Sequence, residues 1–147
     1  MCQQTKGGGI VYVPPGNYLV AGNLVIPSSV TLKGAWNSPP FTWGTGSTAL
    51  GTTLFATAGA GSAGGAPFIF MNGNNAAIEG ITIYYPNQIQ SNPVVAYPFT
   101  IQGNGNDISI QNLLLVNPYQ AIDFSSYSCP RHYIEGVYGQ VSTIPFN

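Results

Sequence analysis

The only clustering of chemically reactive side chains in this chain lies between positions 123 and 135, where Asp123, Arg131, His132 and Glu135 occur. A carboxylate such as that of Asp123 could act as a general acid or base, and His132, the one imidazole of the chain, could assist by moving protons. Arg131 could hold a carboxylate group of a substrate through paired hydrogen bonds. We therefore predict Asp123 and His132 as catalytic residues and Arg131 as a substrate-binding residue.

Each of these residues also has an ordinary structural explanation. Asp123 falls at an outward position of an alternating strand, where any polar residue is tolerated. Its expected neighbours on the preceding strands, Thr100 and Ile69, offer no catalytic partner. Arg131 and His132 fall in a predicted turn, where both could simply cap a surface loop. The residues alone leave both interpretations open.

Aromatic side chains make up 12% of the chain, and several of them fall at or near predicted loops. Sugar rings stack on aromatic faces, so aromatic residues among Asn and Gln suit a carbohydrate cleft. Packing of loops against the domain would explain them equally well. We predict Tyr97 and Tyr119 as substrate-binding residues. The full set near loops is Trp36, Trp43, Tyr84, Tyr85, Tyr97 and Tyr119.

The overall composition narrows the possible partners. Charged residues make up 5% of the chain, against roughly a quarter in ordinary soluble domains, and the net charge is −1. Such a chain has little electrostatic attraction for nucleic acid or for an anionic membrane, so we expect neither as a partner. It has no apolar run long enough to span a bilayer. The spacing of its His, Cys, Asp and Glu residues fits neither a zinc nor a calcium site, so we expect no metal and no cofactor.

Four stretches of the chain follow one pattern: an alternating apolar strand, a short polar turn, and a second strand interrupted by Gly or Asn. The interrupting residues, Gly34, Gly80, Asn112 and Gly136, are separated by 46, 32 and 24 residues. A repeat near two dozen residues with insertions is typical of a solenoid whose coils stack on one another. We expect each interrupting residue to adopt a left-handed backbone conformation that turns the chain sharply. The four stretches are residues 23–36, 67–83, 99–116 and 121–139.

Alternation within the first strand of each coil predicts which side chains enter the core. Two inserted segments, residues 37–66 and 84–98, interrupt the repeat. The first contains a strand-like patch at Thr52–Ala56, and the second has three prolines, which favour an ordered surface loop over a central strand. The expected inward pairs are Leu24/Ile26, Phe68/Phe70, Phe99/Ile101 and Ile122/Phe124, and the expected outward residues are Val25, Ile69, Thr100 and Asp123.

One residue before each interrupting Gly or Asn, the coils carry an outward column of polar residues. Glu79 and Glu135 in this column would stand about 9.6 Å apart, near the upper limit of the roughly 6.5–9.5 Å separation of an inverting glycosidase pair. A solvated ladder interrupted by Gln111 is the simpler explanation. The remaining acidic residue, Asp107, lies in a Gly-Asn-Gly-Asn-Asp segment and is explained by turn formation. The column consists of Lys33, Glu79, Gln111 and Glu135.

Two segments of the chain resemble a known superfamily. Residues 7–36, GGGIVYVPPGNYLVAGNLVIPSSVTLKGAW, are similar to the opening of the pectate-lyase-like (pectin lyase-like) right-handed parallel β-helix superfamily. Residues 95–124, VAYPFTIQGNGNDISIQNLLLVNPYQAIDF, resemble its rhamnogalacturonase/epimerase-like branch. The resemblance implies an all-β fold, a right-handed parallel β-helix with three strands per coil. With the repeat it predicts about four to five coils and two inserted loops in a single domain over residues 1–147.

The same resemblance implies a carbohydrate-active, extracellular protein that acts on or binds a polysaccharide, through lyase or glycoside hydrolase chemistry if it has turnover. Asp123 would then be acid or base, Arg131 would bind the carboxylate of a uronic acid, and His132 would assist. The chain departs from the polygalacturonases of the superfamily, because it lacks their Asn-X-Asp, Asp-Asp, Gly-His-Gly and Arg-X-Lys motifs. The alternative is a glycan-binding or structural solenoid segment of a surface protein, without turnover.

Proteins of this superfamily usually begin with an amphipathic helix that covers the first coil, and they continue for many further coils. Only six residues precede the Gly7-Gly8-Gly9 run here. The resemblance therefore implies that the chain is a fragment of a longer protein. Uncapped coils would expose unpaired backbone and apolar side chains, so we expect self-association through the coil ends.

Overall fold

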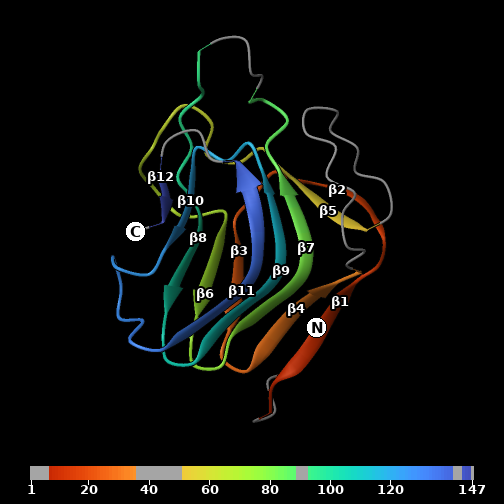
Figure 1. Cartoon of the computed structure of the whole chain (residues 1–147), viewed down its shortest axis with the longest axis vertical. Helices are drawn as coiled ribbons and strands as arrows, with labels where there is room; N and C mark the ends of the chain where they lie inside the picture. The colour runs from red at the N-terminus through yellow and green to blue at the C-terminus, as the bar shows by residue number, and fades with distance from the viewer. Residues whose placement is uncertain (1–6, 36–50, 89–92, 141–143, 147) are drawn as a thin grey trace.

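The computed structural model describes residues 7–35, 51–88, 93–140 and 144–146, and over these ranges the chain forms twelve β-strands (Figure 1). All pairings between these strands are parallel. No helix of the length and apolar character needed to cross a membrane occurs in these ranges. The strands are β1 (Gly9–Val13), β2 (Gly16–Val20), β3 (Leu24–Pro27), β4 (Val30–Gly34), β5 (Thr52–Ala56), β6 (Ile69–Asn72), β7 (Ala77–Tyr84), β8 (Phe99–Asn104), β9 (Ile108–Val116), β10 (Gln120–Asp123), β11 (His132–Gln140) and β12 (Ile144–Phe146).

The strands form two sheets of parallel strands, and the chain passes from one sheet to the other within each coil. One sheet contains the first strand of each coil, in the order β3, β6, β8, β10, β12. The other contains β1, β4, β7, β9 and β11; β5 pairs with the second half of β7, and β2 pairs with β5. From β7 onward, the second and third strands of a coil are one long, bent strand. β5, predicted as a strand-like patch inside the first inserted segment, is the third strand of its coil. The stacked coils in Figure 1 confirm the solenoid predicted from the repeat and the parallel β-helix that the resemblance implies.

The bend within each long strand is made by a residue with a left-handed backbone. The φ angle is 69° at Gly80, 51° at Asn112 and 61° at Gly136, as the repeat predicted. Gly34, the fourth member of the set, lacks a positive φ, so the prediction of a left-handed turn is wrong there. A Cβ at Gly34 would lie 2.7 Å from Cγ1 of Ile81 and would also contact the carbonyl oxygen of Gly80. This glycine is required by close packing between coils and not by a turn.

Asn112→Ala is expected to lower the free energy of unfolding by about 1 kcal/mol, because alanine tolerates the left-handed conformation less well than asparagine. The matched control is Asn112→Gly, which should change stability by less than about 0.5 kcal/mol, since glycine adopts this conformation without strain. Urea unfolding followed by far-ultraviolet circular dichroism measures both. Equal destabilisation by both variants would show that the asparagine side chain matters and the backbone conformation does not.

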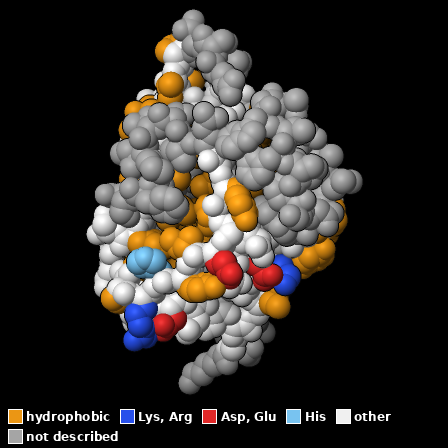
Figure 2. All heavy atoms as spheres, in the orientation of Figure 1, with side chains coloured by type: hydrophobic (Ala, Val, Ile, Leu, Met, Phe, Trp, Pro, Cys, Tyr) orange, Lys and Arg blue, Asp and Glu red, His pale blue; other side chains and the backbone are white. Residues whose placement is uncertain are grey.

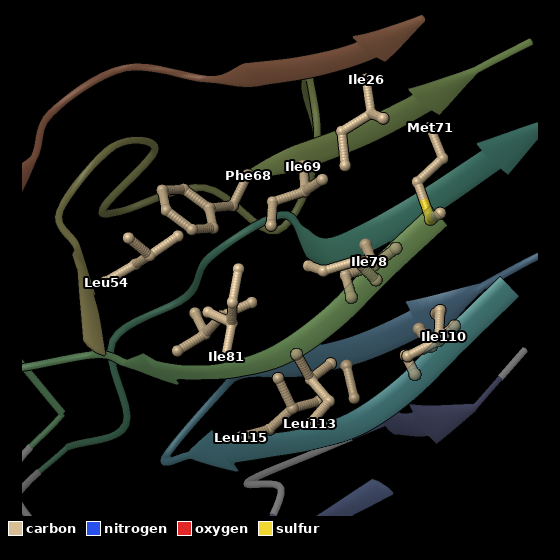
Figure 3. Packing of buried hydrophobic residues seen from close by; sticks show 14 of the residues in the cluster. Ile26, Leu54, Phe68, Ile69, Met71, Ile78, Ile81, Ile110, Leu113 and Leu115 are labelled. Carbon is tan, nitrogen blue, oxygen red and sulfur yellow. The ribbon is translucent and has the colours of Figure 1, made fainter. Parts of the chain in front are cut away.

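The core is a stack of aliphatic side chains between the two sheets. Ile69, Ile101 and Ile122 occupy equivalent positions on β6, β8 and β10 and are buried. From the other sheet, Ile78 and Ile110 form a second buried column on β7 and β9. Figure 3 shows buried side chains of both sheets filling the space between them. Because equivalent positions carry similar aliphatic groups, the buried side chains of each coil stack on those of the next.

The strand β6 reverses the predicted pattern of inward and outward side chains. The register places Ile69 opposite Ile101, in the inward column, and Phe70 opposite Gln102, in the outward column. The prediction that Phe70 faces the core and Ile69 faces outward is therefore wrong. The Phe-Ile-Phe-Met segment is apolar throughout, so alternation could not set its phase, and pairing with the next coil decides it. Thr100, expected on the surface, is also buried, and its hydroxyl donates to the carbonyl oxygen of Gln120.

The second inserted segment, residues 84–98, is attached to the coils through buried side chains. Tyr85 and Tyr97 are buried, and their rings meet edge to face with centroids 4.9 Å apart. The side-chain amide of Gln88 forms paired hydrogen bonds with the backbone of Val95, which draws the two arms of the segment together. After Tyr84, the last residue of β7, the described residues of this segment form no strand, as predicted, and residues 89–92 lie outside the described ranges.

Candidate functional site

Asp123 is the last residue of β10, and it is 0% exposed. The register places it opposite Gln102 of β8, whose Nε2 donates to Asp123 Oδ2 at 2.6 Å. Asp123 Oδ1 accepts hydrogen bonds from the backbone N–H groups of Ser125 and Ser126 and from the Ser125 hydroxyl, at 2.9–3.1 Å. Asp123 lies in the outward column of its sheet, as predicted. The prediction that it is exposed and lies beside Thr100 is wrong, because its neighbour is Gln102 and the chain after β10 turns back and bonds the carboxylate.

These surroundings keep Asp123 ionised. Burial by itself would raise the pKa of Asp123, but the hydrogen bonds from Ser126, Gln102 and Ser125 outweigh burial and lower that pKa to about 2. At neutral pH the carboxyl group therefore has no proton to donate, which disfavours a role as general acid. Because its oxygens hold the turn after β10 against β8, the residue has a clear structural role.

Arg131 forms a bidentate ion pair with Asp107 across neighbouring coils. Its Nε donates to Asp107 Oδ1 at 2.8 Å, and its Nη2 donates to Asp107 Oδ2 at 2.7 Å. The φ angle of 58° at Asp107 confirms the prediction of a turn residue. The hydrogen bonds from Arg131 lower the pKa of Asp107, and the same bonds raise the pKa of Arg131. To bind a substrate carboxylate through these same paired donors, Arg131 would have to exchange Asp107 for the substrate.

His132 begins β11 and is exposed to solvent. Its ring packs against Phe124 with centroids 4.8 Å apart, and its Nδ1 lies 3.2 Å from the carbonyl oxygen of Cys129. Cys129 is a buried free thiol whose pKa is raised by burial. The contacts of His132 are thus with a phenyl ring and a carbonyl group, and its assistance to Asp123 stays a prediction.

The two tyrosines predicted to bind substrate differ in their surroundings. Tyr97 is buried against Tyr85, and its hydroxyl accepts a hydrogen bond from Asn87 Nδ2 at 3.1 Å. The alternative explanation, packing of the inserted loop, therefore describes Tyr97, and a role in substrate binding has no support from this position. Tyr119 is half-buried and packs against the hydrophobic core, and its role in binding stays a prediction.

The outward polar column predicted from the repeat is present on the second sheet. The register aligns Lys33, Glu79, Gln111 and Glu135 on β4, β7, β9 and β11. Lys33 Nζ donates to both carboxylate oxygens of Glu79, at 3.0 and 3.1 Å. In Figure 2, some of the acidic side chains in view lie next to basic ones. A second column on the same side of the sheet lies two residues earlier in each strand. We call the two columns together the Lys33–Glu135 face, which consists of Thr31, Lys33, Ala77, Glu79, Ser109, Gln111, Tyr133 and Glu135.

Two exposed tyrosines of β11 are not among the site residues predicted from the sequence. Tyr133 is 51% exposed and Tyr138 is 47% exposed. The hydroxyl of Tyr133 donates to Glu135 Oε2 at 2.7 Å, a hydrogen bond that raises the pKa of Tyr133. The sequence did carry a signal, because Tyr133 lies two residues before Glu135, and alternation puts both on the face of the outward column.

Each carboxylate in the described residues bonds to a partner of its own. Glu79 and Glu135 are separated in their column by Gln111, and each bonds to a different partner. Within the described ranges, no group of three or more His, Cys, Asp or Glu side chains could hold a metal ion. The arrangement offers polar and aromatic groups along the outside of the coils, and these groups are suited to hydrogen bonding and ring stacking.

Comparison with known proteins agrees with this architecture. No curated protein and no solved structure gives a significant match. A family model described as rhamnogalacturonase A/epimerase, pectate lyase-like, matches residues 1–128. The match includes both segments on which the resemblance rests, and it extends from the first strand through β10. The chain therefore belongs to the pectate lyase-like rhamnogalacturonase A/epimerase family, within a carbohydrate-active superfamily of parallel β-helices.

Proposed function

We propose that this protein binds a polysaccharide along the Lys33–Glu135 face without cleaving it. Membership of a pectate lyase-like family supports a carbohydrate ligand. The observation that carries binding over turnover is that all four acidic side chains of the chain have structural partners. These pairings are Glu79 with Lys33, Asp107 with Arg131, Asp123 with Gln102, Ser125 and Ser126, and Glu135 with Tyr133.

Hydrolysis of a glycosidic bond ordinarily requires two carboxylates on opposite sides of that bond. The carboxylate predicted as acid or base, that of Asp123, is instead buried under the turn that follows it. The outward columns run along the stacking axis and repeat at about 4.8 Å from coil to coil. Such a surface presents polar groups in a row and is suited to an extended polymer.

Affinity electrophoresis of the chain through gels that contain single polysaccharides measures binding, and a reducing-end assay on the same mixtures measures hydrolysis. Ultraviolet absorbance of unsaturated uronate detects lyase products. We expect at least one polymer to retard the chain without any cleavage product. Cleavage that disappears in Asp123→Asn would replace the proposal with the catalytic role predicted for Asp123. If no polymer retards the chain, carbohydrate binding is excluded.

A further inference from the structure

The most exposed part of the Lys33–Glu135 face lies over β9 and β11. Asp107 precedes β9 and Arg131 precedes β11. These two residues form an ion pair at the N-terminal ends of the two strands. The register then pairs Ser109 with Tyr133 and Gln111 with Glu135. We call this surface the β9–β11 patch, which consists of Asp107, Ser109, Gln111, Arg131, Tyr133 and Glu135.

The basic side chains in and near the patch are already paired with carboxylates, which disfavours an anionic sugar as ligand. Arg131 is held by both carboxylate oxygens of Asp107, and the other described cation, Lys33, is held by both oxygens of Glu79. A polyuronate would bring one negative charge per sugar residue close to Glu135. Lys33 and Arg131, the Lys and Arg side chains in the described ranges, each already have an acidic partner, so neither offsets this repulsion fully.

We infer that the polysaccharide bound at the β9–β11 patch is neutral, an inference that rests on the binding function proposed above. The exposed ring of Tyr133 offers a stacking surface for a sugar, and its hydrogen bond to Glu135 restrains the ring. Glu135 and Gln111 together supply acceptors and donors for sugar hydroxyl groups. A neutral sugar meets these groups without charge repulsion, whereas a uronic acid meets an Arg131 whose charge is already balanced by Asp107.

The test compares one polymer in two charge states. The neutral probes are a β-glucan, a galactan and a mannan, and each is compared with the same polymer after oxidation of its primary hydroxyls to carboxylates. At low ionic strength, where charge effects are least screened, we expect the best neutral ligand to bind at least about tenfold more tightly than its oxidised form. Equal or tighter binding of the oxidised form would overturn the inference and leave polysaccharide binding standing. Binding of neither form would overturn both.

Two tyrosine variants locate the binding surface. Tyr133→Ala is expected to weaken binding of the neutral polymer by about tenfold or more, because a central exposed aromatic ring is lost. Tyr127→Ala is the matched control, since Tyr127 is 46% exposed but packs against Phe70 of the other sheet. We expect it to bind like the parent chain. Unchanged binding in Tyr133→Ala, or equal losses in both variants, would exclude the β9–β11 patch.

A third variant tests the role of charge directly. Asp107→Asn removes the negative charge that occupies Arg131, and asparagine tolerates the φ angle of 58° at this turn. We expect this variant to bind the oxidised polymer several-fold more tightly than the parent chain does, with little change for the neutral form. Absence of any gain would show that the pairing of Arg131 does not determine the ligand class.

Discussion

Leu113→Ala is expected to lower the free energy of unfolding by about 2–5 kcal/mol, because it removes buried methyl groups and leaves a cavity between the sheets. Leu113 is 0% exposed and lies opposite Ile81 in one neighbouring coil and Val137 in the other. Since strand ladders hold β9 on both sides, the structure can collapse only partly into the space. Urea unfolding followed by far-ultraviolet circular dichroism measures the loss.

Leu114→Ala is the matched control for this prediction. The two leucines are neighbours in β9, but Leu114 is only partly buried and lies in an outward column with Thr82 and Tyr138. Removing a partly buried side chain should cost less than about 1 kcal/mol. Equal losses in the two variants would contradict the inward position of Leu113.

Asp123→Ala is expected to cost about 1–3 kcal/mol at neutral pH, because it removes the acceptor of the buried Gln102 amide and of the turn that follows β10. The donors are the amide of Gln102 and the N–H groups of Ser125 and Ser126. Asp123→Asn should cost less, since it keeps one side-chain oxygen and Gln102 can turn its own oxygen toward the new amide. The same unfolding measurement applies. If Asp123→Ala were as stable as the parent chain, the carboxylate would not be a structural anchor, and its predicted role as acid or base would gain support.

The low pKa of Asp123 also predicts that acid destabilises the protein. Its pKa is about 2 in the folded chain and 3.8 ordinarily, so the folded state favours the ionised form. The resulting stability is present above about pH 4, is lost as the pH falls through about 2, and amounts to about 2 kcal/mol. Unfolding free energies of the parent chain and Asp123→Asn, compared at about pH 6 and about pH 2, isolate this contribution from that of Asp107, whose pKa is also lowered. If the parent chain and Asp123→Asn lost the same free energy of unfolding between these two pH values, the predicted contribution of Asp123 would be contradicted.

The architecture and one outward column could be predicted from the sequence, because both follow from local periodicity. The residues that interrupt each coil repeat at related positions, and the aligned polar column on β4, β7, β9 and β11 lies one residue before them. Alternation then assigns neighbouring residues to the inside or the outside wherever apolar and polar residues take turns. Lys33 and Glu79 meet as opposite charges for this reason.

The surroundings of Asp123 could not be predicted in the same way. Its neighbour in the preceding coil is Gln102 and not Thr100, a difference of two residues that leaves the alternation unchanged. Alternation therefore places both candidates on the same face and cannot distinguish them. The serine turn that buries the carboxylate depends on the path of the chain after β10, which follows no repeat.

By itself, the sequence determined the stacked parallel coils, the left-handed bends at Gly80, Asn112 and Gly136, and the polar column on the outer face. These features depend on the order of residue types over a few positions, and that order repeats along the chain. Only the tertiary structure decided that Asp123 is buried and that Arg131 is occupied by Asp107. Both outcomes arise from contacts between coils, whose exact register and connecting turns are set by packing and hydrogen bonding across residues distant in the chain.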